Sequence, residues 1–186
     1  EVGGVATQVL ARIYEERGEH ARWVEVLRKQ AEYAETSQAR QEIFFRIAAI
    51  QEEKMGSAEL AIATWREVLA EDHDSGRALD ALERLHNARR EFAELVEVLR
   101  KRIAVNDSPE QRRALLLRVA LLQERELRNV SETIIAYQEA VDLMPEDVDA
   151  LRELARLYRQ ERRFADLFDN NERLLPACKD PGERAV

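Results

Sequence analysis

The chain has 186 residues and a formal net charge of −8; 35% of its residues are charged, and it holds only 6 Gly and 4 Pro. So few helix breakers predict an all-α protein and exclude the collagen-like, low-complexity and disordered classes. The negative charge disfavours nucleic acid as the main partner, and we expect none, because phosphate binding needs a basic surface. The single cysteine, Cys178, excludes a disulfide framework and a cysteine-based zinc site.

Membrane insertion is not expected. The longest apolar runs, 43–45 and 114–117, are each ended by an arginine, so neither is long enough to span a bilayer. No basic region followed by an apolar stretch resembles a signal peptide, and together with the missing disulfides this favours a cytoplasmic location. Arginine greatly outnumbers lysine, which is typical of a high-GC genome and favours a bacterial source.

A period of 72 residues organises the chain. The hexapeptide that begins at Val24 recurs without change at Val96, and residues 1–72 share 20 identities with residues 73–144 without any gap. Self-similarity at a fixed offset indicates a repeat architecture built by duplication. The block from Leu154 to Tyr158 continues the same register into a third copy.

Each 72-residue block divides into two helical pairs. We predict first helices over 5–17, 37–54, 76–88, 109–127 and 147–160. We predict second helices over 20–34, 57–71, 91–105, 130–143 and 163–177. Short turns make paired helices antiparallel, and one amphipathic pair cannot bury both of its faces, so the pairs stack. The sequence therefore predicts an α-α solenoid of about five antiparallel helix pairs. We expect one domain over 1–186, with repeats at 5–35, 37–72, 76–106, 109–144 and 147–178.

The predicted helix starts repeat with the same spacing. Thr36, Ser108 and Asp180 lie 72 residues apart, and each can accept a backbone N–H as an N-cap. Pro109 and Gln111 follow Ser108 in a capping-box arrangement. Because the segment after Asp180 repeats that pattern, we expect residues 179–186 to begin a further, truncated helix and the chain to be part of a larger protein.

These pairs resemble tetratricopeptide repeats. The motif of that family fits in the blocks Leu154-Ala155…Tyr158, Leu10-Ala11…Tyr14, Thr133…Tyr137…Ala140…Pro145 and Ala61…Trp65. The resemblance covers nearly all of residues 5–178 and implies a right-handed superhelix that binds a protein or peptide on the concave face lined by first helices. Glu83 and His86 depart from the motif, at a small and an aromatic position. Other helical-pair solenoids remain open, including the RNA-reading pentatricopeptide type, against which the acidic charge argues.

No arrangement of residues predicts catalysis. His20 and His86 align with aromatic residues at the 72-residue offset, so we interpret them as packing residues, and His73 as part of a loop. Arg46 and Arg118 interrupt the most apolar helices. Each arginine either contacts a ligand carboxylate or pairs with a glutamate of the next helix, and we favour the pair, since a lone buried charge is too unfavourable. The sequence predicts no enzyme activity, no cofactor and no metal site.

The best candidate for a functional surface is a stripe along the first helices. The resemblance places on the concave face the residues Arg12, Phe45, Arg84, Leu117, Arg152 and Arg156. Arginine binds carboxylates through two parallel hydrogen bonds, so this stripe favours an acidic and apolar protein segment as the partner. The competing interpretation is that the stripe only repeats by duplication, with its arginines paired to neighbouring glutamates. The chain would then be a structural spacer or assembly scaffold without a dedicated ligand.

Overall fold

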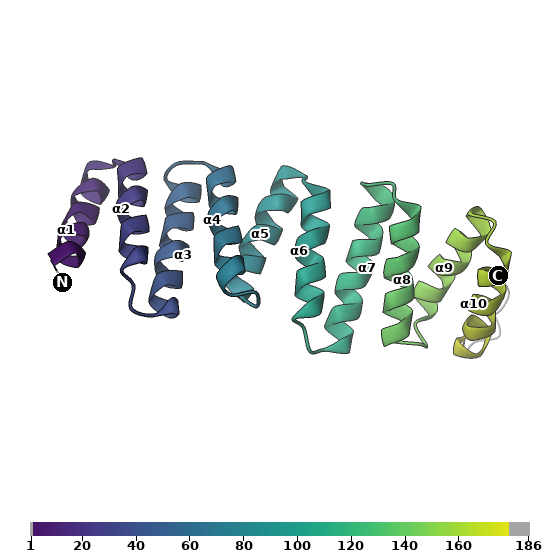
Figure 1. The fold of residues 1–186 in the computed structure, drawn as a ribbon. Helices are drawn as coiled ribbons and strands as arrows, with labels where there is room; N and C mark the ends of the chain where they lie inside the picture. The colour runs from purple at the N-terminus through teal and green to yellow at the C-terminus, as the bar shows by residue number, and fades with distance from the viewer. Residues whose placement is uncertain (1, 179–186) are drawn as a thin grey trace. The chain divides into compact units, whose positions relative to one another are not determined.

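The described part of the chain is entirely helical. The computed structural model describes residues 2–178, which form ten helices and no strand (Figure 1). The predicted all-α class is therefore confirmed, and within each unit neighbouring helices pack on one another as in an α-α solenoid. The helix expected over 179–186 lies outside the described residues.

The helix bounds agree with the prediction to within three residues at every end. The first helices of the pairs are α1 (Val2–Arg17), α3 (Ser37–Glu53), α5 (Gly76–Arg89), α7 (Pro109–Arg125) and α9 (Val148–Gln160). The second helices are α2 (His20–Glu32), α4 (Ala58–Glu71), α6 (Phe92–Ala104), α8 (Val130–Leu143) and α10 (Phe164–Ala177).

Side-chain caps fix the starts of the long first helices. The Thr36 hydroxyl accepts from Ala39 N at 3.1 Å, and the Ser108 hydroxyl accepts from Gln111 N at 3.3 Å. Both predicted N-caps are confirmed, while Asp180 lies outside the described residues. The reciprocal half of the capping box differs, because the backbone N–H of Ser108 donates to the Asn106 side chain at 3.0 Å. Asn106 thus replaces Gln111 as the partner of that orphan donor.

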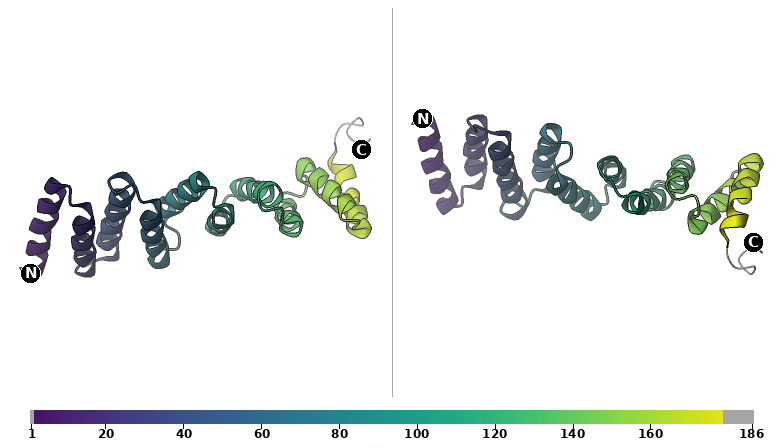
Figure 2. Two further views of the ribbon diagram at one scale, coloured as in Figure 1. Left: turned by 90° about the horizontal axis from the view of Figure 1, so that it is seen from above. Right: turned by 90° about the horizontal axis from the view of Figure 1, so that it is seen from below.

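The tertiary contacts divide the chain into two compact units. Unit 1 is Glu1–Arg89 and holds α1 to α5, and unit 2 is Arg90–Val186 and holds α6 to α10. Within each unit the main packing contacts join successive helices, as a solenoid requires. Figure 2 shows the same succession of helices from two further sides. The organisation of the chain as one domain stays a prediction, and the units are described separately below.

Each unit has an apolar core between its helix pairs. In unit 2, Leu116 and Val119 of α7 pack with Tyr137 of α8 and Leu151 of α9, and all four are buried. Ala120 and Ala140 belong to the same core and are fully buried, and their small side chains let the helices approach closely. In unit 1, Trp23 and Leu27 of α2 pack with Ile47 and Ile50 of α3. Burying each large apolar side chain contributes about 1.5–3 kcal/mol, so these contacts hold the helix pairs together.

Candidate partner-binding surface

The six residues predicted to line a groove fall in both units. Arg12, Phe45 and Arg84 lie on α1, α3 and α5 of unit 1. The other three lie on first helices of unit 2, Leu117 on α7 and both Arg152 and Arg156 on α9. A continuous stripe along all five repeats stays a prediction, and each set is placed within its own unit.

In unit 1 both predicted arginines have carboxylate partners. The Arg84 guanidinium binds the Glu52 carboxylate through both of its terminal nitrogens, with Nη2 and Oε2 at 2.8 Å. This hydrogen bonding lowers the pKa of Glu52 and raises the pKa of Arg84. The Arg12 Nε donates to Glu16 one turn further along the same helix, at 3.0 Å, and both side chains are exposed.

Phe45 belongs to the core of unit 1. Its side chain is 7% exposed and its ring lies 5.4 Å from that of Trp65. The Arg77 guanidinium covers the Phe45 ring from outside, 4.4 Å from its centre. A partner would therefore touch Arg77 before it could touch Phe45.

Arginine–glutamate pairs join successive first helices in unit 1. Arg46 of α3 binds Glu15 of α1 at 3.0 Å, and its guanidinium also lies 5.0 Å from the centre of the Trp23 ring. The expectation that Arg46 pairs with a glutamate is confirmed, although the partner is on the preceding first helix and not on the next helix. Exposed pairs of this kind contribute about 0–1 kcal/mol each, so a partner's carboxylate can displace one at small free-energy cost.

In unit 2 an open hollow of about 340 Å³ lies between α7, α8 and α9. It is lined by Leu121, Glu124, Arg125, Tyr137, Glu153 and Arg156. Arg156 of α9 binds Glu124 of α7 and also Glu153 on its own helix, at 2.8 Å. Since Arg84 and Glu52 lie 72 residues earlier, the two units repeat this pair. Among the predicted stripe residues, Arg156 is the one that lines the hollow.

Two other residues of this hollow were not predicted to act together. Leu121 is 39% exposed, although it is a large apolar side chain. Arg125, at the end of α7, is exposed and has no carboxylate partner among the residues that the structure describes. The repeat pattern did not point to Arg125 as a binding residue, because the residue 72 positions earlier is Glu53 and not an arginine.

Leu117 and Arg152 take less accessible positions. Leu117 is partly buried against the core of unit 2, and Arg152 is also partly buried. Tyr137 forms the inner wall of the hollow, where burial, followed by the nearby Glu153 and Glu124, raises the pKa of its hydroxyl. The hollow therefore combines an apolar surface, an exchangeable arginine and a second arginine without an internal carboxylate.

The histidines take the positions expected from the sequence. His86 is buried in unit 1, and His20 is partly buried with its ring 6.4 Å from that of Trp23, so the packing interpretation is confirmed for both. His73 is exposed in the turn between α4 and α5. Cys178 is buried at the end of α10. In the described part of the chain, no three His, Cys, Asp or Glu side chains gather closely enough to hold a metal ion. None of its helices is long and apolar enough to cross a bilayer.

Comparison with known proteins gives likenesses at the level of structure only. No protein-family model matches the sequence, and no curated protein is significantly similar to it. A MamA crystal structure aligns over 99% of this chain and 96% of its own, with 12% identity and a TM-score of 0.47. MamA from Desulfovibrio magneticus aligns over 95% and 94%, with 16% identity and a TM-score of 0.44. Pseudomonas aeruginosa pilF aligns over 98% and 79%, with 18% identity and a TM-score of 0.42. Values of this size carry no inference about what this chain binds.

Proposed function

We propose that the chain is a non-catalytic protein-interaction module that binds a segment of another protein on the surface of its first helices. In unit 2 the binding site is the hollow lined by Leu121, Arg125 and Arg156. The single observation that supports this site most is the exposed Leu121 next to Arg125, an arginine without a carboxylate partner among the described residues.

The chemistry of the hollow favours an acidic and apolar segment. An apolar side chain of the partner would cover Leu121, and a carboxylate would bind Arg125 without displacing any pair inside the chain. A second carboxylate could replace Glu124 or Glu153 on Arg156. A hydrogen bond to a charged group contributes about 1.5–3 kcal/mol, so two such contacts and one apolar contact suffice for a weak, specific complex. Both an extended and a helical segment can present this pattern.

A structural spacer is the second candidate function. It is favoured by the pairing of Arg12, Arg84 and Arg156 with glutamates of the same unit. If the pairs of Arg84 and Arg156 only fix the spacing of the first helices, and that of Arg12 only stabilises its own helix, the repeated arginines need no ligand. The two functions make different predictions for Arg125, which is needed for partner binding but has no role in a spacer.

Selection from a displayed random-peptide library tests the proposal. We expect the intact chain to enrich peptides that combine Asp or Glu with large apolar residues. The double variant Leu121→Asp, Arg125→Glu should bind the enriched peptides at least tenfold more weakly, which equals about 1.4 kcal/mol of binding free energy. Arg66→Glu is the matched control, because Arg66 is an exposed arginine on α4 outside the hollow.

Circular dichroism of each variant separates a loss of binding from a loss of fold. If no acidic and apolar peptides are enriched, or if the double variant binds them as well as the unmodified chain does, the proposal is wrong and the spacer function is favoured.

A further inference from the structure

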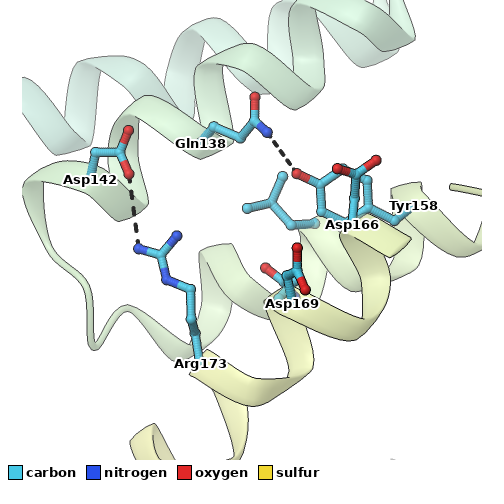
Figure 3. Close-up of a pocket in the computed structure, with 8 residues that line it drawn as sticks. Gln138, Asp142, Tyr158, Asp166, Asp169 and Arg173 are labelled. Carbon is cyan, nitrogen blue, oxygen red and sulfur yellow. Dashed lines mark hydrogen bonds and ion pairs between the residues drawn. The ribbon is translucent and has the colours of Figure 1, made fainter. Parts of the chain in front are cut away.

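A second hollow of unit 2 has the opposite chemistry. It lies between α8, α9 and α10, has a volume of about 360 Å³, and presents mainly hydrogen-bond acceptors (Figure 3). It is lined by Gln138, Asp142, Leu154, Tyr158, Asp166, Asp169, Asn170 and Arg173. The size suits one long side chain or a small ligand.

A buried amide stands in this hollow where the repeat has an apolar residue. Asn170 is 5% exposed, and the residues 72 and 144 positions earlier are Val98 and Val26, both buried. The Asn170 Nδ2 donates to the Leu151 carbonyl at 2.9 Å. Its Oδ1 has no donor among the residues that the structure describes. This oxygen keeps some access to solvent while the rest of the residue is buried, so it is open to a ligand in the hollow that donates a hydrogen bond.

The carboxylates of the hollow outnumber its cations. Asp166 binds Arg163 at 2.7 Å, and Asp142 lies 3.9 Å from Arg173. Asp169 projects from α10 toward the same space and has no cationic partner in the described part of the chain (Figure 3). One negative charge therefore remains uncompensated at the mouth of the hollow.

The remaining polar groups add acceptors at the inner wall. The Gln138 Nε2 donates to the Tyr158 hydroxyl at 2.8 Å, which leaves the Gln138 Oε1 available as an acceptor. Burial, the largest influence, raises the pKa of Tyr158. The hydroxyl therefore stays neutral while it accepts the Gln138 N–H. The set of acceptors around one uncompensated charge matches a cation that carries several N–H groups.

We propose that this hollow binds a protonated nitrogen group, supplied by an arginine or lysine side chain of a partner protein. Asp169 supplies the charge, Asn170 Oδ1 and Gln138 Oε1 accept hydrogen bonds from the bound group, and Leu154 contacts its aliphatic stem. The site is separate from the one lined by Leu121, and its ligand has the opposite charge.

The test follows the side-chain amide signals of Asn170 and Gln138 by ¹H–¹⁵N NMR in the intact chain. The probes are capped Gly-Arg-Gly and Gly-Lys-Gly peptides, the Gly-citrulline-Gly peptide as an uncharged analogue of the arginine peptide, and putrescine as a free diamine. We expect the arginine or the lysine peptide to shift both signals, the citrulline peptide to leave them unchanged, and putrescine to bind more weakly.

Two variants and one control locate the site. Asp169→Asn removes the uncompensated charge, and Asn170→Val restores the residue found in the other repeats, so both should fold. Each variant should lower the affinity for the charged peptide about tenfold. Glu172→Gln lies on the same helix outside the hollow and should leave this affinity unchanged. Equal binding of the citrulline peptide, unchanged affinity in Asp169→Asn, or no shift with either charged peptide would overturn the proposal. Binding of putrescine alone would also overturn it, in favour of a free amine. None of these variants alters the Leu121 hollow, so this proposal and the proposed function can fail independently.

Discussion

At the scale of single residues, the turns after the first helices share one backbone conformation. The residue after each first helix, or a few residues beyond it, has a positive φ, and these residues are Gly18, Gly56, Arg90, Arg128 and Arg162. They follow the 72-residue register, in which Gly56 corresponds to Arg128. A residue other than glycine costs about 1–2 kcal/mol in this left-handed region. The arginines are therefore strained where the glycines are not.

The first prediction is that Arg128→Gly stabilises the chain by about 0.5–1 kcal/mol, because glycine adopts a φ of 53° without steric strain. Urea unfolding measures the change. Gly56→Ala is the converse control and should destabilise the chain by about 1 kcal/mol. No atom lies within 4 Å of a Cβ added at Gly56, so only the backbone conformation would oppose it. A loss of stability in Arg128→Gly would contradict this explanation and assign the arginine side chain a structural role.

Asp147 is the second residue with a defined energetic role. Its Oδ1 accepts from Ala150 N at 3.3 Å and caps α9, and its other oxygen binds Arg113. Burial acts to raise the pKa of Asp147, but the hydrogen bonds from Arg113 and from backbone N–H groups outweigh it and leave the pKa below its usual value. A folded-state pKa below the unfolded one gives stabilisation that is present above the unfolded pKa and lost as the pH falls through the folded value.

We therefore expect the free energy of unfolding to fall as the pH drops from about 5 to about 3, and Asp147→Asn to flatten this dependence. Asparagine keeps the helix cap but loses the charge, so at pH 7 the variant should be less stable by about 1–2 kcal/mol. Urea unfolding at several pH values measures both effects. Glu146→Gln, an exposed neighbour, is the control. An unchanged pH slope in Asp147→Asn would show that other carboxylates cause the acid sensitivity.

At the scale of the elements, α10 exposes a face that its equivalents bury. Phe168 is 64% exposed, whereas the corresponding Val96 of α6 is 8% exposed. Leu175 is exposed as well, whereas the corresponding Ile103 is buried. The cause is that α7 packs on α6, while no helix of the described residues follows α10 in the stack.

The exposed face predicts a difference between two matched substitutions. Val96→Ser should destabilise the chain by about 1–3 kcal/mol, because it puts a hydroxyl into a packed interface and removes apolar contacts. Phe168→Ser should change stability by less than about 0.5 kcal/mol, as exposed sites normally do. Both are measured by urea unfolding of the intact chain. An equal loss in the two variants would mean that the Phe168 face is covered in solution.

The sequence predicted the helices better than it predicted the site. The helix ends followed from the caps at Thr36 and Ser108 and from the 72-residue register, which are local signals. The burial of Phe45 was not predictable, because α3 is apolar around most of its circumference and its sequence does not distinguish the inner face. Pairing between first helices depends on residues about 30 positions apart, so the partner of Arg46 required the structure. The signal for Asn170 was present, since an amide replaces the valines of the other repeats.

At the scale of the whole molecule, both units present arginine–glutamate pairs between first helices, and unit 2 adds two hollows of opposite chemistry. We propose that the Leu121 hollow binds an acidic and apolar protein segment. Hydrogen–deuterium exchange of the intact chain, with and without a peptide selected from the library, tests it most directly. We expect slower exchange in the segments 117–125 and 148–156 when the peptide is bound, and no change in these segments for the double variant Leu121→Asp, Arg125→Glu. Protection confined to α10 or to unit 1, or no protection by a peptide that binds, would contradict the claim.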